Sequence, residues 1–312
     1  MTSNFDSLYI FGDSLSDTGN VLNFTGGEFP VAPYEPGRFS NGDVWVDDLA
    51  KELDLDVDLF SNPLNFLADN DGINYAIGGA TSGDDNIGIV PLGLEQQIDS
   101  FEISTTFQSP KETLEDDLFF LWVGANDYFS FIEDDPATPD IVETNFPENG
   151  RETIDAVIDV VNINIRGAVG DIIDAGGEDI VIFNLPDLSE TPLAQNLTIK
   201  DQNKLRQLTN THNRRLDRLV DNIESNNPDV NLIEIDVNEL AQSIFDNPGE
   251  FGLTNVNDNF TGIDIVANLN QPPAIGDPNE YFYWDSVHPT TAVHDLVADL
   301  VIHELSNEGL LV

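Results

Sequence analysis

The chain contains no cysteine among its 312 residues. Neither a disulfide framework nor a thiolate metal site can form without it, and the redox compartment stays open. The sequence also has no EF-hand loop, Walker loop, dinucleotide fingerprint, G-x-S-x-G elbow or H-E-x-x-H motif. It therefore predicts no metal ligands among the site residues and no cofactor.

Long apolar runs are missing as well. The longest covers roughly residues 118–123, far short of the ~20 residues that a membrane-spanning helix needs. We expect no transmembrane segment. No basic region or long apolar run precedes the first predicted strand, so we also expect no signal peptide in this sequence. Localisation stays open between the cytoplasm and export by a route without an N-terminal signal.

Basic residues are few. Eleven lysines and arginines stand against 58 aspartates and glutamates, which gives a formal net charge of −47. Such a surface repels nucleic acid and anionic membranes, so we expect neither as a partner. Two explanations of the acidity are open: a halophilic surface that stays hydrated in strong salt, and calcium loading of a secreted protein. We favour general acidity, because Asp54, Asp56 and Asp58 alternate with Leu55 and Val57 as on the wet face of a strand.

Short apolar runs alternate with helical patterns along the chain. The sequence predicts five buried strands, at residues 8–11, 73–77, 118–123, 180–183 and 232–237. Strands that alternate with helices are typical of a doubly wound α/β fold with a parallel sheet. No repeat, linker or break in composition divides the chain, so we expect residues 1–312 to form a single domain. Segments 132–149 and 246–280 are predicted to be irregular loops.

One helix, predicted from about residue 198 to 226, has an unusual charge. It carries six of the eleven basic residues, which we expect to neutralise acidic neighbours: Lys200, Lys204, Arg206, Arg214, Arg215 and Arg218. His212 falls on its apolar stripe, so we expect a hydrogen-bonded core histidine rather than a ligand. For His294 and His303, which lie within the last predicted helix, we expect packing or surface roles.

The first strand ends in a sharp polar turn, FGDSLSDTGN. This turn places Ser14 at the carboxyl edge of the predicted sheet, close to the start of a helix. Ligands of open α/β sheets bind at that edge, and free backbone N–H groups there can hold negative charge. Ser14 is therefore a candidate nucleophile, although Gly-Asp-Ser by itself is more often only a turn.

The other groups that acyl transfer needs also occur at strand ends and loops. Gly79 follows the second predicted strand and Asn126 the third, so the N–H groups of Ser14 and Gly79 and the Asn126 amide could surround an oxyanion. Asp285 and His288 stand three residues apart before the last helix, a spacing that lets the carboxylate reach one imidazole nitrogen. Each residue also has a structural explanation: a tight turn for Gly79, a cap for Asn126, and a position ahead of a helix for Asp285.

Four blocks of the sequence, in order, match those of a known family: FGDSLSDTGN, NYAIGGATS, VGAND and WDSVHPT. The chain thereby resembles the GDSL-type lipases and esterases, or SGNH hydrolases, in particular their plant and bacterial lipase/acylhydrolase branch. The resemblance implies a three-layer α/β/α, flavodoxin-like fold with a parallel five-stranded sheet. It also implies Ser14 as nucleophile, His288 as base, Asp285 as its orienting acid, and an oxyanion hole of Ser14, Gly79 and Asn126.

The resemblance implies a serine carboxylester hydrolase that works through an acyl-enzyme on a small-molecule or lipid ester. Two alternatives are open. A carbohydrate O-acetylesterase uses the same chemistry in a different cleft, and a catalytically silent surface or binding protein could share the fold. The sequence leaves acyl length, head group and oligomeric state open.

Overall fold

The structure is a computed structural model that describes residues 5–62, 72–107, 114–133, 153–264, 269–270 and 273–311. Its strands are β1 (Leu8–Gly12), β2 (Asp58–Leu59), β3 (Gly72–Asn74), β4 (Leu118–Trp122), β5 (Asp179–Phe183), β6 (Asn231–Ile235), β7 (Asn255–Asn259), β8 (Ile263–Asp264), β9 (Leu269–Asn270) and β10 (Tyr281–Tyr283). Its helices are α1 (Asn20–Phe24), α2 (Trp45–Leu53), α3 (Leu94–Phe107), α4 (Ala125–Glu133), α5 (Ile154–Ala175), α6 (Pro192–Gln195), α7 (Ile199–Asn226), α8 (Val237–Asp246) and α9 (Thr291–Asn307).

The central sheet has the strand order β2-β3-β1-β4-β5-β6, and its neighbouring strands are parallel. From β1 the chain passes to β2 and β3 on one side and then crosses to β4 on the other. The carboxyl end of β1 is therefore a topological switch point, where open α/β sheets bind their ligands. The predicted doubly wound α/β fold is confirmed.

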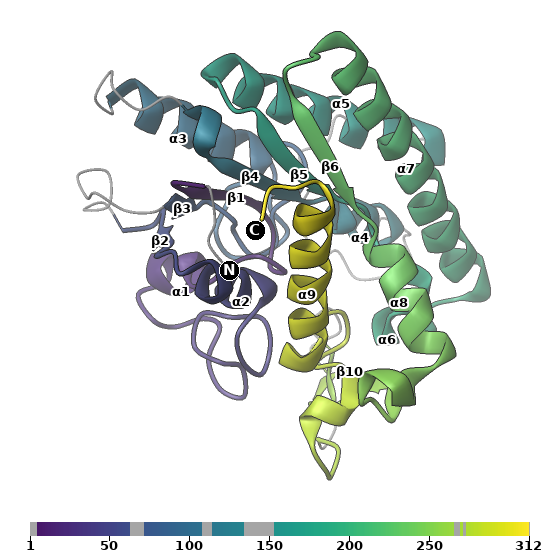
Figure 1. The fold of residues 1–312 in the computed structure, drawn as a ribbon. Coiled ribbons are helices and arrows are strands. Elements are labelled where there is room, and N and C mark those ends of the chain that lie inside the picture. The colour runs from purple at the N-terminus through teal and green to yellow at the C-terminus, as the bar shows by residue number, and fades with distance from the viewer. Residues whose placement is uncertain are drawn as a thin grey trace.

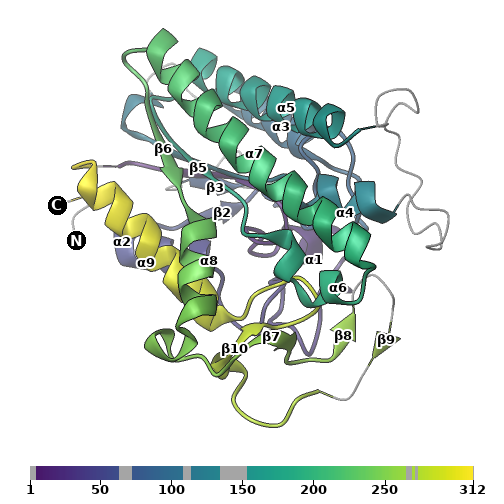
Figure 2. The same cartoon turned by 90° about the vertical axis from the view of Figure 1, so that its right-hand side faces the viewer.

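Helices cover both faces of this sheet. α3, α5 and α7 lie along one face, while α2 and α9 pack together along the other (Figures 1 and 2). Every residue of β1 and β4 is buried, as expected for inner strands of a covered parallel sheet. The sheet is therefore a rigid platform whose carboxyl edge carries the loops after β1, β3 and β4.

The prediction of five strands was wrong by one, since the central sheet has six. The additional strand is β2, a two-residue edge strand in which Asp58 pairs with Ile73 and Leu59 with Asn74. Both β2 residues are only half-buried. A strand this short carries too little alternation to be counted from sequence, although the alternating stretch 54–58 does end in it.

The prediction of an irregular segment at 246–280 was also partly wrong. It contains β7, which pairs with β10, and β8, which pairs with β9. The β7 sequence, Asn-Val-Asn-Asp-Asn, is poor in strand-forming residues, so the pairing partner rather than the local sequence makes this strand. The other predicted loop lies outside the described residues from position 134 onward.

Three of the basic residues of α7 form ion pairs with acidic residues, as expected. Arg206 lies 3.3 Å from Asp187 and 3.1 Å from Glu190, and Lys204 lies 2.8 Å from Asp201. A second cluster pairs Arg215 with two carboxylates of α5, Asp155 and Asp159. The Arg206 and Arg215 contacts join α7 to acidic residues of neighbouring segments, while the Lys204 contact lies within α7.

Candidate active site

A continuous chain of hydrogen bonds joins three of the predicted residues. The Ser14 hydroxyl lies 2.8 Å from Nε2 of His288, and Nδ1 of that ring lies 2.7 Å from Oδ2 of Asp285. All three residues are buried. A hydroxyl, an imidazole and a carboxylate in this order can activate the hydroxyl as a nucleophile.

The turn after β1 holds Ser14 in place. The backbone N–H groups of Ser16 and Asp17 both donate to the carbonyl oxygen of Asp13, each at 3.1 Å. Gly12 ends the strand with a φ of +156°, and a Cβ there would lie 2.4 Å from a carbonyl oxygen of β4. The strand can therefore run close beside β4 and still deliver Ser14 to the carboxyl edge of the sheet.

The Asp285 carboxylate is fully buried and accepts four hydrogen bonds. Oδ1 accepts the backbone N–H of Val287 at 2.9 Å and that of His288 at 2.8 Å. Oδ2 accepts from Nδ1 of His288 and from the hydroxyl of Tyr34, each at 2.7 Å. Burial alone raises the pKa of this carboxyl group, but the His288 ring and the two backbone N–H groups outweigh it and lower the pKa below 3.8. The ionised carboxylate thus holds the proton on Nδ1.

Gly79 and Asn126 reach the same edge from the strands on either side. They follow β3 and β4, the neighbours of β1, and line the same cavity as Ser14. The Asn126 amide nitrogen donates to the carbonyl oxygen of Ala80 at 2.9 Å and to Oδ2 of Asp13 at 3.3 Å. Within the described part of the chain, no acceptor pairs with the backbone N–H of Ser14 or Gly79. Ser14, Gly79 and Asn126 thus line one cavity, two of them with backbone N–H groups that have no acceptor among the described residues.

The backbone at Gly79 requires glycine. Its φ is +85°, and a Cβ would lie 2.7 Å from Oδ1 of Asn86 and 2.7 Å from the backbone nitrogen of Gly88. The Asn86 amide closes the loop by donating to the carbonyl oxygens of Gly78 at 3.2 Å and Leu92 at 2.9 Å. The direction of the Gly79 N–H is therefore fixed by a tightly packed turn.

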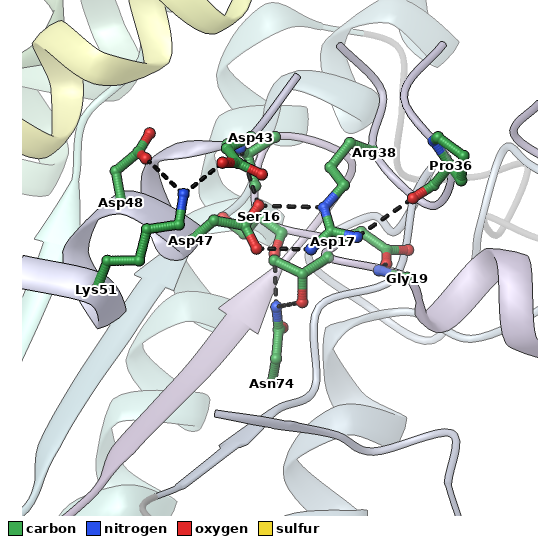
Figure 3. A network of polar contacts seen from close by, with 12 residues as sticks. Ser16, Asp17, Gly19, Pro36, Arg38, Asp43, Asp47, Asp48, Lys51 and Asn74 are labelled. Atoms are coloured by element: carbon green, nitrogen blue, oxygen red, sulfur yellow. Dashed lines mark hydrogen bonds and ion pairs between the residues drawn. The ribbon is translucent and has the colours of Figure 1, made fainter. Parts of the chain in front are cut away.

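Two buried carboxylates beside Ser14 were not predicted as site residues. Burial raises the pKa of Asp13 to about 7, against the lowering effects of a backbone N–H and of His288. Burial also raises the pKa of Asp17 to about 6. Asp17, which Figure 3 shows beside Ser16 and Gly19, accepts backbone N–H groups of residues 19–21 and, at 2.9 Å, that of Gly78. It therefore ties the turn after β1 to the loop that carries Gly79. Their one sequence signal is their place in the D-S-L-S-D stretch.

A cavity of about 370 Å³ opens beside these groups, and Ser14, Asn126 and His288 line it. Most of its walls are apolar. One set of walls comes from α1 and from the loops after α1 and β3: Val21, Phe29, Phe39, Ile87 and Ile89. Another comes from β4, α8 and α9: Trp122, Leu240, Ala241, Ile244, Val293 and Val297. The cavity suits an apolar group larger than a methyl.

The other histidines have the predicted structural roles. His212 is buried, its Nδ1 lies 2.8 Å from the Tyr128 hydroxyl, and burial lowers its pKa to about 4. His294 is buried and its Nδ1 accepts the Trp45 backbone N–H at 3.4 Å. Burial, with a smaller effect of His288, lowers the pKa of His294 to about 3. His303 is exposed on α9.

Two features are absent from the described residues: a cluster of metal-ligating side chains and a helix that could span a membrane. No group of three or more histidine, aspartate or glutamate side chains there is arranged to hold a metal ion. No helix within those ranges is both long and apolar enough to cross a bilayer.

Comparison with known proteins relates the chain to one family along almost its whole length. The family model for GDSL-like Lipase/Acylhydrolase matches residues 8–301. A GDSL esterase/lipase of Arabidopsis thaliana is 28% identical over 94% of this chain and 80% of its own length. The phosphatidylcholine-sterol acyltransferase of Aeromonas hydrophila is 28% identical over 95% of this chain and 88% of its own length. A solved acetyl xylan esterase aligns at 14% identity over 95% of this chain and 98% of that chain, with a TM-score of 0.45, a likeness too weak to inform on substrate.

Proposed function

This chain belongs to the GDSL-like lipase/acylhydrolase family and is a carboxylic ester hydrolase, and we propose that it cleaves esters through Ser14, His288 and Asp285. The observation that carries the proposal is the chain of hydrogen bonds from the Ser14 hydroxyl through His288 to Asp285, at 2.8 Å and 2.7 Å. Ser14, at one end of this series of hydrogen bonds, lines an apolar cavity.

In the first half of the proposed reaction, Ser14 Oγ attacks the ester carbonyl carbon while Nε2 of His288 takes the hydroxyl proton. The carbonyl oxygen becomes an oxyanion, and the ionised Asp285 stabilises the imidazolium that forms. The imidazolium then gives its proton to the leaving alcohol, and an acyl-enzyme remains on Ser14. In the second half, water repeats the sequence as nucleophile and releases the acid.

The oxyanion would be held by the backbone N–H groups of Ser14 and Gly79 and by the amide of Asn126. Two features support the role of Asn126. Its 2.9 Å bond to Ala80 fixes the orientation of the amide, and the longer 3.3 Å contact with Asp13 leaves a weakly held hydrogen for the substrate. The steps as proposed use these protein groups and water alone.

The substrate we propose is an ester with an aliphatic acyl chain longer than acetyl. The mostly apolar walls of the cavity support this choice, because burying methylene groups there gains about 0.8 kcal/mol for each one. The relative named for phosphatidylcholine also favours a lipid ester. A carbohydrate O-acetylesterase needs polar groups that recognise sugar hydroxyls. The mostly apolar lining of this cavity therefore supports a carbohydrate substrate less well than an aliphatic ester.

A chain-length series tests the proposal. Initial rates on p-nitrophenyl acetate, butyrate, octanoate and palmitate would be compared with acetate release from acetylated xylan. We expect kcat/KM to rise above its acetate value for the medium chains. Ala241→Phe places a larger side chain at the α8 wall of the cavity. It should lower kcat/KM for the longer acyl chains and leave kcat/KM for acetate, the internal control, unchanged. A maximum at acetate with strong xylan deacetylation would instead support the carbohydrate esterase. No turnover of any of these esters would support a silent binding protein.

A further inference from the structure

Tyr34 contacts the candidate catalytic groups from a distant part of the sequence. Its hydroxyl lies 2.7 Å from Oδ2 of Asp285, although 251 positions separate the two residues. The same oxygen receives Nδ1 of His288 at 2.7 Å. Because Asp285 has no exposed surface, Tyr34 takes the place that water would fill beside an exposed carboxylate. One carboxylate oxygen thus serves two donors.

The direction of this hydrogen bond is fixed. Burial, followed by the charge and the hydrogen bond of Asp285, raises the pKa of the Tyr34 hydroxyl far above its usual value of 10. Tyr34 therefore stays protonated at working pH and can only donate to the ionised carboxylate. Its ring is set edge-on against Trp284, with 6.3 Å between ring centroids, so the hydroxyl is aimed by packing as well.

The segment that carries Tyr34 is anchored on both sides. The Arg38 guanidinium binds both carboxylate oxygens of Asp47 on α2, at 2.6 Å and 3.1 Å, and also donates to the carbonyl oxygen of Pro36 at 3.2 Å (Figure 3). The Ser40 hydroxyl donates to the carbonyl oxygen of Pro289 at 2.9 Å, next to His288. Residues 34–40 therefore form a strap that is tied to α2 at one point and to the His288 loop at another.

The strap also touches the imidazole itself. The ring of Phe39 lies 5.3 Å from that of His288, between centroids, at an interplanar angle of 34°. Phe39 thus packs against the His288 imidazole, while Tyr34 donates to the Asp285 carboxylate that His288 also binds.

We propose that Tyr34 is a positioning residue of this ester hydrolase, acting through Asp285. Its hydroxyl fixes Oδ2 of the carboxylate and takes part of the negative charge that would otherwise act on His288 alone. The inference rests on the proposed roles of Ser14, His288 and Asp285. It assigns Tyr34 no contact with the reacting atoms.

The physical consequence is a change in the pH dependence of the reaction. An ionised carboxylate that loses a hydrogen-bond donor attracts the imidazolium proton more strongly. The rise of kcat/KM with pH should then occur at higher pH. Other titratable groups that act on this imidazole are Asp13 from the turn after β1 and His294 from α9, and both remain unchanged in a Tyr34 variant.

Tyr34→Phe tests the proposal, because it removes the hydroxyl and keeps the ring. We expect the midpoint of the kcat/KM profile to rise by about 0.5 to 1 pH unit, since a hydrogen bond to a charged group corresponds to about one unit or more at the carboxylate itself. KM and the plateau rate at high pH should stay within about threefold. The proton NMR resonance of the His288 Nδ1–H should move downfield as its hydrogen bond to Asp285 strengthens.

Tyr75→Phe is the matched control. The Tyr75 hydroxyl is also buried and hydrogen-bonded, at 2.9 Å to Ser104, but it belongs to the core and not to the cavity lining. This variant should lower the melting temperature without moving either the pH midpoint or the NMR resonance. Arg38→Gln, which loosens the strap and leaves Tyr34 in the sequence, should move the midpoint in the same direction by a smaller amount and serves if Tyr34→Phe folds poorly.

The outcomes separate this inference from the proposed function. A wild-type protein whose turnover does not need Ser14 would overturn the proposed function. If turnover needs Ser14, a Tyr34→Phe midpoint within about 0.2 pH unit of wild type and an unmoved resonance would overturn the role of Tyr34 alone. Tyr34 lines the cavity, so a change in KM with an unmoved midpoint would also overturn the proposal and make Tyr34 a substrate-contacting residue instead.

Discussion

Replacing Asp285 by asparagine should leave the fold intact and remove most of the turnover. Oδ1 of Asp285 accepts two backbone N–H groups, at 2.8 Å and 2.9 Å, so the amide oxygen of the variant must take that place. The amide nitrogen then faces Nδ1 of His288 and donates to it. The ring proton is forced onto Nε2, where it points at Ser14 Oγ and prevents Nε2 from accepting the hydroxyl proton.

The expected loss follows from that wrong tautomer. The same substitution in another serine hydrolase lowers kcat about 10⁴-fold, which corresponds to about 5.5 kcal/mol at 1.36 kcal/mol for each factor of ten. KM should change little, because Asp285 is fully buried and does not line the cavity. Steady-state kinetics on a p-nitrophenyl ester give kcat and KM, and a melting curve shows whether the variant is folded.

Asp221→Asn is the matched control for this substitution, since it removes one carboxylate from the exposed surface of α7. It should leave kcat within about twofold of wild type, as surface substitutions usually have small effects. A folded Asp285→Asn protein that loses less than about tenfold in kcat would refute the reasoning from the tautomer.

Three further predictions follow from the geometry and the charge. Asn126→Ala should lower kcat about 10²- to 10³-fold with little change in KM; a raised KM with kcat intact would make Asn126 a substrate-binding residue. Burial and a hydrogen bond with Asp48 raise the pKa of Asp295 from 3.8 to about 6, so this group lowers stability as pH rises from about 4 to 6. Asp295→Asn should therefore raise the melting temperature at pH 8 and not at pH 3.5, and equal shifts at both would contradict it. Because 58 acidic residues face only 11 basic ones, the melting temperature should climb between 0.1 and 2 M sodium chloride, as screening shortens from about 10 Å to about 3 Å or less. A flat response, with a sharp rise in millimolar calcium that a chelator reverses, would favour calcium loading over a halophilic surface.

Local sequence signals predicted most of the architecture. Short apolar runs predicted the inner strands, and apolar stripes at helical spacing predicted the long helix α7 and the last helix α9. β2 and β7 were missed because pairing, not local composition, makes them strands. The nine-residue α4 was missed because it starts directly after β4 and is too short for its periodicity to stand out.

Some residues of the candidate site had a local sequence signal, and others depend on contacts made only in the folded chain. Ser14, Gly79 and Asn126 could be predicted to meet because each follows a strand, and the carboxyl ends of parallel strands share one edge. Asp285 and His288 could be predicted to interact because they stand only three residues apart. Tyr34 carried no such signal, since its partner lies 251 positions away and the strap that aims it depends on contacts made only in the folded chain. The raised pKa of Asp13 likewise results from burial, which its position in the turn did not reveal.

The most direct test of the central claim is covalent capture of the nucleophile. A fluorophosphonate ester should add once to the native protein, and peptide mass analysis should place the adduct on Ser14. The adduct should be absent in Ser14→Ala, which should also lose about 10³-fold or more in kcat, and it should form very slowly in His288→Ala. An adduct on another residue, or a Ser14→Ala protein with near-normal turnover, would contradict the account.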